Sequence, residues 1–136
     1  MKLRFEMSSV FSRIINGEIP CYKVGENESY FAFLDINPLK PGHTLVVPKQ
    51  EVDKLFDLDE KMYLGLMEYS RKIALAIEKS IPCDRVGIAV VGLEVPHAHV
   101  HLIPIDEPGD TDFSKKRIKL SQDQFEQIAR SISINV

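Results

Sequence analysis

The sequence predicts an α+β domain: a five-stranded antiparallel sheet with one long helix, a short N-terminal helix and a C-terminal helix. One long segment repeats apolar residues every three or four positions, as one face of a helix does. Five short segments are apolar or alternating, as strands are, and they do not alternate regularly with helices. The 136 residues, 44% of them hydrophobic, are enough for one domain over 1–136. We expect its core at about 9–105, followed by a C-terminal loop and helix at 106–136.

The N-terminal half contains the short helix and three of the strands. Ser8 or Ser9 is a suitable N-cap for the helix, and Asn16-Gly17 would end it, since both residues tolerate positive φ. We predict strands over 22–26, 29–35 and 43–48. Alternation on the second strand puts Phe31, Phe33 and Asp35 on one face and Ala32 and Leu34 on the other.

The C-terminal half begins with the long helix. Asp57 and Glu60 have capping-box spacing, and Pro82 marks the end of the helix. Its apolar stripe consists of Met62, Leu66, Tyr69, Ile73 and Ile77. Two further strands are predicted at 85–91 and 98–105, then a polar, solvated loop over 106–117. A last helix starts at Ser121, and Gln124 completes its capping box.

Charge and composition exclude several classes of protein. The formal net charge of −3 argues against a general nucleic-acid binder, although a phosphate site can be locally positive. The sequence has no run of about 18 apolar residues, so we expect no membrane span. The two cysteines, Cys21 and Cys83, lie far apart and are expected to be reduced thiols. A cytoplasmic location is the default expectation.

Three of the four histidines occur at alternate positions, His97, His99 and His101. On a strand, alternate side chains point the same way, so the three imidazoles should form a row. Three interpretations are open at this point. The row is the polar face of a half-exposed strand, a catalytic zinc site with three histidine ligands, or a nucleophilic site for phosphorus chemistry. Neutral imidazole is a good nucleophile near pH 7, and its neighbours can hold phosphate oxygens.

The wider sequence favours the third interpretation, because HAHVHLI resembles the signature of the histidine triad (HIT) family. FSRIINGEIP resembles the opening segment of that family, FAFLDINPLKPGHTLVVPK its central block, and DLDEKMYLGLM the start of its long helix. These segments cover roughly residues 9–105, in the order of the family. The resemblance implies a HIT-like fold and a nucleotide hydrolase or transferase that cleaves a purine conjugate at the α-phosphate.

The resemblance also implies a role for individual residues. His99 would attack the α-phosphorus and carry the nucleotidyl group, His97 would orient it through its backbone carbonyl, and His101 and His43 would contact phosphate. Asp35 would accept hydrogen bonds from the ribose hydroxyls, although it could also serve only as a turn residue before Asn37-Pro38. The residues matching positions that line the base are Phe11, Ile14, Phe33 and Ile36, for which ordinary core packing is the alternative.

The sequence departs from the family in two places. Ser9, Ser12 and Glu51 stand where many bacterial members have the two cysteines and the histidine that, with the first triad histidine, hold a structural zinc. Because serine is a poor zinc ligand, we predict no metal and no cofactor. Glu94 stands where a hydroxyl normally faces the phosphate, and a carboxylate there would repel substrate unless it points away, is paired or acts as an acid.

Because of these departures, the sequence does not identify the leaving group. A second interpretation also stays open, a nucleotide-binding regulatory protein with little catalysis. The expected partners are a purine nucleotide or nucleotide conjugate and, as is common in the family, a second copy of the chain in a homodimer. The family dimer joins two sheets edge to edge.

Overall fold

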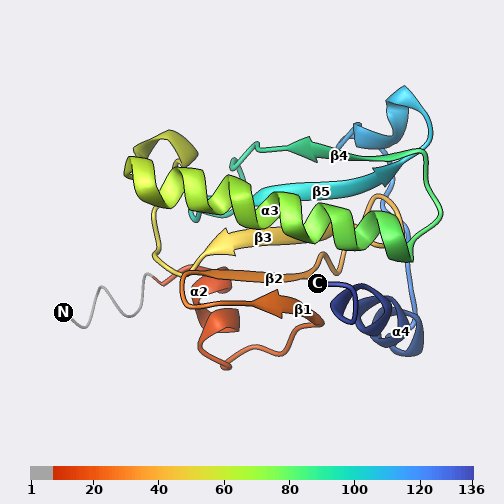
Figure 1. The fold of residues 1–136 in the computed structure, drawn as a ribbon, viewed down its shortest axis with the longest axis horizontal. Helices are drawn as coiled ribbons and strands as arrows, with labels where there is room; N and C mark the ends of the chain where they lie inside the picture. The colour runs from red at the N-terminus through yellow and green to blue at the C-terminus, as the bar shows by residue number, and fades with distance from the viewer. Residues whose placement is uncertain (1–7) are drawn as a thin grey trace.

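A computed structural model describes residues 8–136 and contains one five-stranded sheet (Figure 1). The strand order is β1-β2-β3-β5-β4, and every neighbouring pair is antiparallel. The predicted sheet is therefore confirmed. Its strands are β1 (Lys23–Glu26), β2 (Tyr30–Leu34), β3 (Thr44–Pro48), β4 (Arg85–Ala89) and β5 (Val100–Ile105).

Three α-helices accompany the sheet: α2 (Val10–Ile15), α3 (Glu60–Ser80) and α4 (Gln122–Ser133). The predicted caps of α2 and α4 are confirmed, since the Ser9 side chain accepts from Ser12 N–H and Ser121 forms a capping box with Gln124. None of the helices in the described part of the chain is both long and apolar enough to cross a bilayer.

The prediction that Asp57 caps the long helix is wrong. Asp57 belongs to a short 3-10 helix, η1 (Leu55–Asp57), and Leu58 after it is extended, with φ −66° and ψ 145°. The chain therefore enters α3 two residues later, where the Asp59 carboxylate accepts a hydrogen bond from Met62 N–H at 2.8 Å. The short side chain of Asp57 cannot cap across an intervening extended residue.

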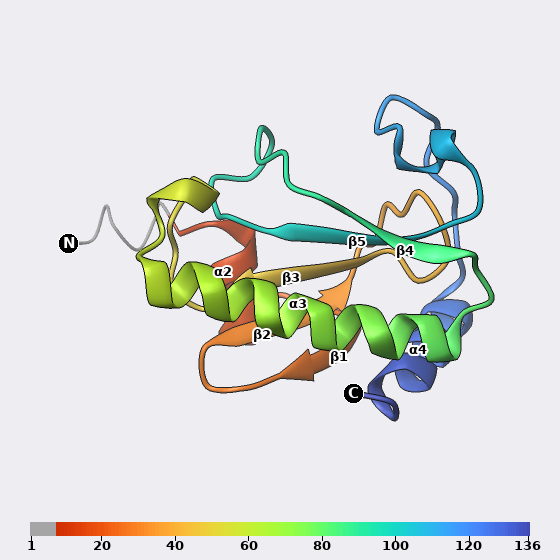
Figure 2. The same cartoon turned by 45° about the horizontal axis from the view of Figure 1, so that its top comes forward.

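The two faces of the sheet bury separate apolar clusters, as the alternation on β2 predicts. Ala32 and Leu34 point toward α3 and α4, which lie across one face (Figure 2). Phe31 and Phe33 point to the other face and pack with Phe11 of α2. Successive side chains of a strand point to opposite faces of the sheet, so the second cluster packs separately from the first. The candidate site lies on the face of this second cluster.

The last two strands are shorter than predicted, so His97 and His99 lie before β5. Pairing of β4 with β5 stops at Ala89 and His101, and that of β3 with β5 stops at Val46 and Val100. Ala98 N–H donates instead to Val52 O at 2.7 Å. The segment therefore leaves the sheet and packs against the chain before η1.

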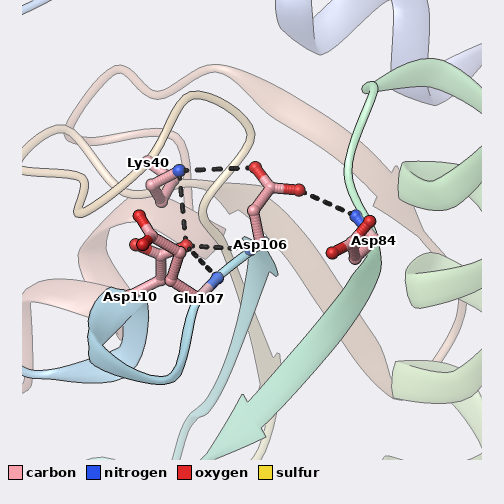
Figure 3. A network of polar contacts seen from close by, with 5 residues as sticks. All are labelled: Lys40, Asp84, Asp106, Glu107 and Asp110. Atoms are coloured by element: carbon pink, nitrogen blue, oxygen red, sulfur yellow. Dashed lines mark hydrogen bonds and ion pairs between the residues drawn. The ribbon is translucent and has the colours of Figure 1, made fainter.

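Residues 106–117 are exposed or half-buried, and polar contacts around Lys40 hold the first part of this segment (Figure 3). Its ammonium lies 3.7 Å from the Asp106 carboxylate and 3.4 Å from that of Asp110. Asp110 also accepts from the backbone N–H groups of Asp106 and Glu107, at 2.8 and 3.0 Å. These contacts fix the short helix η2 (Pro108–Thr111) and direct the chain after it back toward the histidines.

Candidate active site

The four histidines of the chain meet at the join between β3 and β5, and all are buried. His43 directly precedes β3, and His101 lies in β5 opposite Leu45. The predicted row holds for two of the triad histidines: the ring centres of His99 and His101 are 4.9 Å apart, and the ring planes meet at 63°. The ring of His97 turns away toward α2 because its segment has already left the sheet.

The hydrogen-bond partner of His99 decides which of its two ring nitrogens carries the proton. Its Nδ1 lies 2.7 Å from the backbone carbonyl oxygen of His97, which can only accept, so Nδ1 carries the proton. In the neutral ring, Nε2 then keeps its lone pair. The geometry therefore leaves the outer nitrogen of His99 free to act as a nucleophile.

Two linked hydrogen bonds, through His43, decide which ring nitrogen of His101 carries the proton. Leu39 N–H donates to His43 Nδ1 at 3.0 Å, so the neutral ring of His43 carries its proton on Nε2. His43 Nε2 lies 3.0 Å from His101 Nδ1 and donates to it. His101 is thus left with an Nε2–H group, a donor suited to a phosphate oxygen.

Burial keeps the histidine cluster neutral. Burial lowers the pKa of His43 to about 3, and the charges of His101 and Arg117 act in the same direction. Burial also lowers the pKa of His101 to about 4. Burial is also the main cause that lowers the pKa values of His97 and His99. At neutral pH the site therefore offers uncharged imidazoles, as a nucleophile and its donors require.

The residues predicted to line the base are divided between core and surface. Phe11 and Phe33 are buried, with ring centres 5.5 Å apart, and the Phe11 ring meets His99 edge-on at 4.9 Å. Ile14 is half-buried, whereas Ile36 is 64% exposed. Phe11, backed by Phe33, is therefore the aromatic side chain that packs against His99, whereas Ile36 lies at the surface.

Asp35 makes the predicted turn contact and also faces the histidines. One of its carboxylate oxygens accepts from Asn37 N–H at 2.8 Å, and the other lies 3.5 Å from His43 Nε2. Burial raises the pKa of this carboxyl. The turn role and a role toward a ligand are compatible, because they use different oxygens.

Asp35, His43 and His101 could be read as a metal site, since one ligand atom from each lies within 4.8 Å of the others. A histidine ligand must offer a lone pair to the metal. His43 Nε2 carries a proton for as long as Leu39 N–H donates to Nδ1. This trio is therefore built as a hydrogen-bonded group and does not fit a cation.

Ser9, Ser12, Glu51 and His97 come together from distant parts of the sequence. The Ser9 hydroxyl lies 2.7 Å from His97 Nδ1, and the Ser12 hydroxyl donates to the Glu51 carboxylate at 2.6 Å. Ser9 N–H donates to the same carboxylate oxygen at 2.9 Å. His97 completes the set by donating from Nε2 to the Pro48 carbonyl oxygen at 2.8 Å.

Two side chains of the C-terminal segment also reach the site, and the sequence analysis missed both. The Phe113 ring meets His101 at 4.8 Å, and the Arg117 guanidinium carbon lies 5.5 Å from the centre of that ring. Arg117 also donates to the Asn37 carbonyl oxygen at 2.6 Å. The Lys115-Lys116-Arg117 run was the available signal, but nothing local shows that the loop folds back.

Comparison with known proteins identifies the family of this chain. The sequence model of the HIT domain family matches residues 16–108. An uncharacterized HIT-like protein of Borreliella burgdorferi is 35% identical over 135 residues, covering 93% of this chain and 97% of that protein. The chain belongs to the HIT domain family.

Relatives within the HIT family include characterised proteins and solved structures. The adenosine 5′-monophosphoramidase of Schizosaccharomyces pombe is 35% identical, covering 72% of this chain and 74% of that protein. The crystal structure of a Hit-like protein from Bartonella henselae superposes with a TM-score of 0.82, at 29% identity, over 95% of this chain and 96% of that one. A zinc-bound histidine triad protein from Mycobacterium smegmatis has a TM-score of 0.78, at 30% identity, over 95% of this chain and 93% of that one.

Zinc is thus found in one HIT-family relative, but the serine–glutamate set does not fit it here. Ligand atoms around a tetrahedral zinc lie about 3.4 Å apart, and hydroxyl groups are weak ligands at neutral pH. The Ser9 hydroxyl instead touches His97 Nδ1 directly at 2.7 Å. Hydrogen bonds occupy the lone pairs that a metal would need.

The second departure from the HIT pattern, Glu94, lies on the open side of the site. Its side chain is exposed; burial lowers the pKa of His99 and raises that of Asp35, and the charge of Glu94 opposes the first shift and adds to the second, so it acts on the site from nearby. A cavity of about 270 Å³ opens beside His99 and is bordered by Phe56 and Val91. The cavity lies between the chain around η1 and the segment before His97.

Proposed function

We propose that this HIT protein cleaves a purine nucleotide conjugate, with adenosine preferred, at the α-phosphate through a covalent nucleotidyl intermediate on His99. The observation that carries the proposal is the lone pair on His99 Nε2, which is fixed by the 2.7 Å hydrogen bond from Nδ1 to the His97 carbonyl. The S. pombe relative and a Saccharomyces cerevisiae relative, which is 33% identical over 104 residues, are both adenosine 5′-monophosphoramidases, and this supports adenosine phosphoramidates as the substrate class.

In the first step the His99 Nε2 lone pair forms a bond to the α-phosphorus. The bond from phosphorus to the leaving group breaks, and the leaving group departs with that electron pair and takes up a proton. The His99 ring becomes positively charged, and its Nδ1–H bond to the His97 carbonyl strengthens as the charge develops. The His101 Nε2–H group donates to a phosphate oxygen, with His43 holding His101 in that state.

In the second step water attacks the same phosphorus. The bond between phosphorus and His99 Nε2 breaks, the electron pair returns to the ring, and the nucleotide leaves with the oxygen of the water, which releases a proton to solvent. A different acceptor in place of water would make the protein a transferase. The first step needs a neutral His99, which the lowered pKa of this residue supplies at neutral pH, and the second step returns the ring to that neutral state.

The remaining predicted site residues bind the nucleoside in this proposal. Asp35 uses the carboxylate oxygen that is free of the Asn37 contact to accept from the ribose hydroxyls. The base lies against the open Ile36 and the half-buried Ile14, with Phe11 and Phe33 behind them. The leaving group then occupies the cavity beside His99, under the influence of Glu94.

The decisive experiment is incubation with adenosine 5′-phosphoramidate, followed by rapid quenching at alkaline pH and mass spectrometry of the protein, because the P–N bond to histidine is acid-labile. We expect turnover and an adenylylated protein with the wild type, and neither with His99→Ala. His99→Ala should still bind AMP in calorimetry, because the nucleoside contacts remain. Turnover that survives in His99→Ala would refute the covalent role of His99.

A nucleotide-binding regulatory protein is the second candidate. Glu94 favours it, because a carboxylate near the α-phosphate opposes the approach of an anionic substrate. AMP binding without turnover or adduct, across several conjugates, would support this candidate. Replacing Glu94 with Ser or Gln should then increase the affinity for AMP.

We also propose that the protein works as a homodimer in the cytoplasm. The edge strand β4 carries an exposed apolar side chain, Ile88, which is 53% exposed. An apolar edge strand favours pairing with another strand. A two-fold pairing of β4 with its copy would extend the sheet across the dimer.

A further inference from the structure

The network of Ser9, Ser12, Glu51 and His97 joins three parts of the chain beside the nucleophile. Ser9 and Ser12 begin α2, Glu51 follows β3, and His97 precedes β5. The Ser9 and His97 side chains are buried. Ser12 is half-buried and Glu51 is exposed, so the network runs from the interior to the surface, and its buried end is the part that hydrogen bonds hold in one arrangement.

Every proton in the network can be assigned. His97 Nε2 donates to the Pro48 carbonyl, so Nδ1 of the neutral ring accepts from the Ser9 hydroxyl. The Ser9 oxygen in turn accepts from Ser12 N–H at 3.0 Å. Glu51 accepts from Ser9 N–H and from the Ser12 hydroxyl, at 2.9 and 2.6 Å. The buried members, Ser9 and His97, therefore have their side-chain donors and acceptors paired, whereas the exposed Glu51 uses only one of its two carboxylate oxygens.

We propose that Ser9 and Glu51 are positioning residues for His99, which fix the ring and backbone of His97 through hydrogen bonds, without a metal. This inference rests on the proposed function of His99. The link is the backbone of His97, whose side chain is held by Ser9 and Pro48 while its carbonyl oxygen holds His99 Nδ1. Movement of His97 therefore changes both the direction and the protonation of the nucleophile.

Glu51 also helps to position His97, but indirectly, through Ser9 and Ser12. Its carboxylate holds the backbone of Ser9 and the hydroxyl of Ser12, which places the start of α2 against His97. Phe11 of the same helix meets the His99 ring at 4.9 Å. The network therefore fixes His99 from two sides, through the His97 carbonyl and through the Phe11 ring.

Single substitutions at Ser9 separate this role from helix capping. Ser9→Ala removes both the cap and the bond to His97, whereas Ser9→Gly loses little capping energy but the same bond. We expect both to lower kcat by about 10- to 100-fold, with a smaller change in KM, and Ser9→Thr to retain most of the activity. Ser121→Ala, which removes the N-cap of the distant α4, is the matched control and should leave kcat unchanged.

Glu51 is tested in the same way. Glu51→Ala should lower kcat by about tenfold or more, and Glu51→Gln less, because an amide oxygen can still accept both hydrogen bonds. Glu18→Ala is the control, since Glu18 lies just beyond α2 and contacts only Arg13 at 3.7 Å among the ion pairs of the described chain. Equal kcat values for Ser9→Gly, Glu51→Ala and the wild type would overturn the inference.

Nitrogen-15 NMR of the imidazoles gives a measurement that needs no activity. In the wild type His99 should be protonated on Nδ1 and His97 on Nε2. In Ser9→Gly, which keeps the fold, we expect mixed protonation of His97 and a second population of His99. Unchanged spectra would overturn the positioning role even if kcat falls. If no conjugate is turned over by the wild type, the proposed function fails, while the spectra still decide the positioning role.

Discussion

Mild acid should destabilise this protein through the histidine cluster. The chain has only four histidines, and all four lie in the site, so ordinary side chains elsewhere contribute little between pH 7 and 5. Burial lowers the pKa of His43 to about 3 and that of His101 to about 4, from an unfolded value of 6.5. Below pH 6.5 the unfolded chain therefore binds protons that the folded protein excludes, and stability falls as the pH falls.

The size of the effect follows from the difference in proton binding. At pH 5 each of His43 and His101 is 1.5 pH units below its unfolded pKa of 6.5 and still neutral in the folded state. Each then costs about 2 kcal/mol, so the pair costs about 4 kcal/mol, a large part of the 5–15 kcal/mol that stabilises a typical domain. His97 and His99 act in the same direction, since burial lowers the pKa of each. The raised pKa of Asp35 acts in the opposite direction.

Urea unfolding at pH 7, 6 and 5, followed by circular dichroism, measures this loss. His43→Asn should reduce the difference in unfolding free energy between pH 7 and 5 by about 2 kcal/mol. The variant lacks one of the histidines that at pH 5 bind a proton in the unfolded chain but not in the folded protein. The variant will be less stable at pH 7, so the comparison uses the pH dependence of each protein. A wild-type free energy that is constant from pH 7 to 5, or an unchanged pH dependence in His43→Asn, would refute the reasoning.

Three further predictions test other parts of the structure. Phe113→Ala should lower kcat/KM by about 3- to 10-fold in the phosphoramidate assay, because an edge-on ring contact with His101 is lost. Ile88→Glu should convert a dimer to a monomer in light scattering, since a charge on an edge strand opposes pairing, and an unchanged mass would contradict pairing through β4. Gly65→Ala should lower the free energy of unfolding by about 1–3 kcal/mol in urea despite better helix propensity, because its Cβ would meet the hydrogen-bonded Tyr30 hydroxyl.

The fold was predictable because its signals are local. The apolar stripe of α3 and the alternation on β2 each follow from the periodicity of one segment. The end of pairing between β4 and β5 was not predictable, since it depends on Ala98 N–H finding the Val52 carbonyl. The start of α3 was missed because Asp57 and Asp59 both suit a cap, and only the extended Leu58 between them decides which is used.

The candidate site was predictable where one strand or one motif carries it. His97, His99 and His101 were identified from their spacing, and His43 and Asp35 from the resemblance to the HIT family. Residues that act from a distant segment were either missed, as with Phe113 and Arg117, or interpreted only as lost zinc ligands, as with Ser9 and Glu51. Contacts between side chains 40 to 90 positions apart leave no periodic trace in a sequence.

By itself the sequence determined the α+β fold, the family and the imidazoles of the site, because local periodicity and motif spacing are properties of the chain. Only the tertiary structure decided which nitrogen of each ring carries a proton. That choice depends on the acceptor that packing brings to the ring, the His97 carbonyl for His99 and Leu39 N–H for His43. The chemical state of the three alternate histidines is therefore set by backbone groups and by serines that the triad motif does not contain.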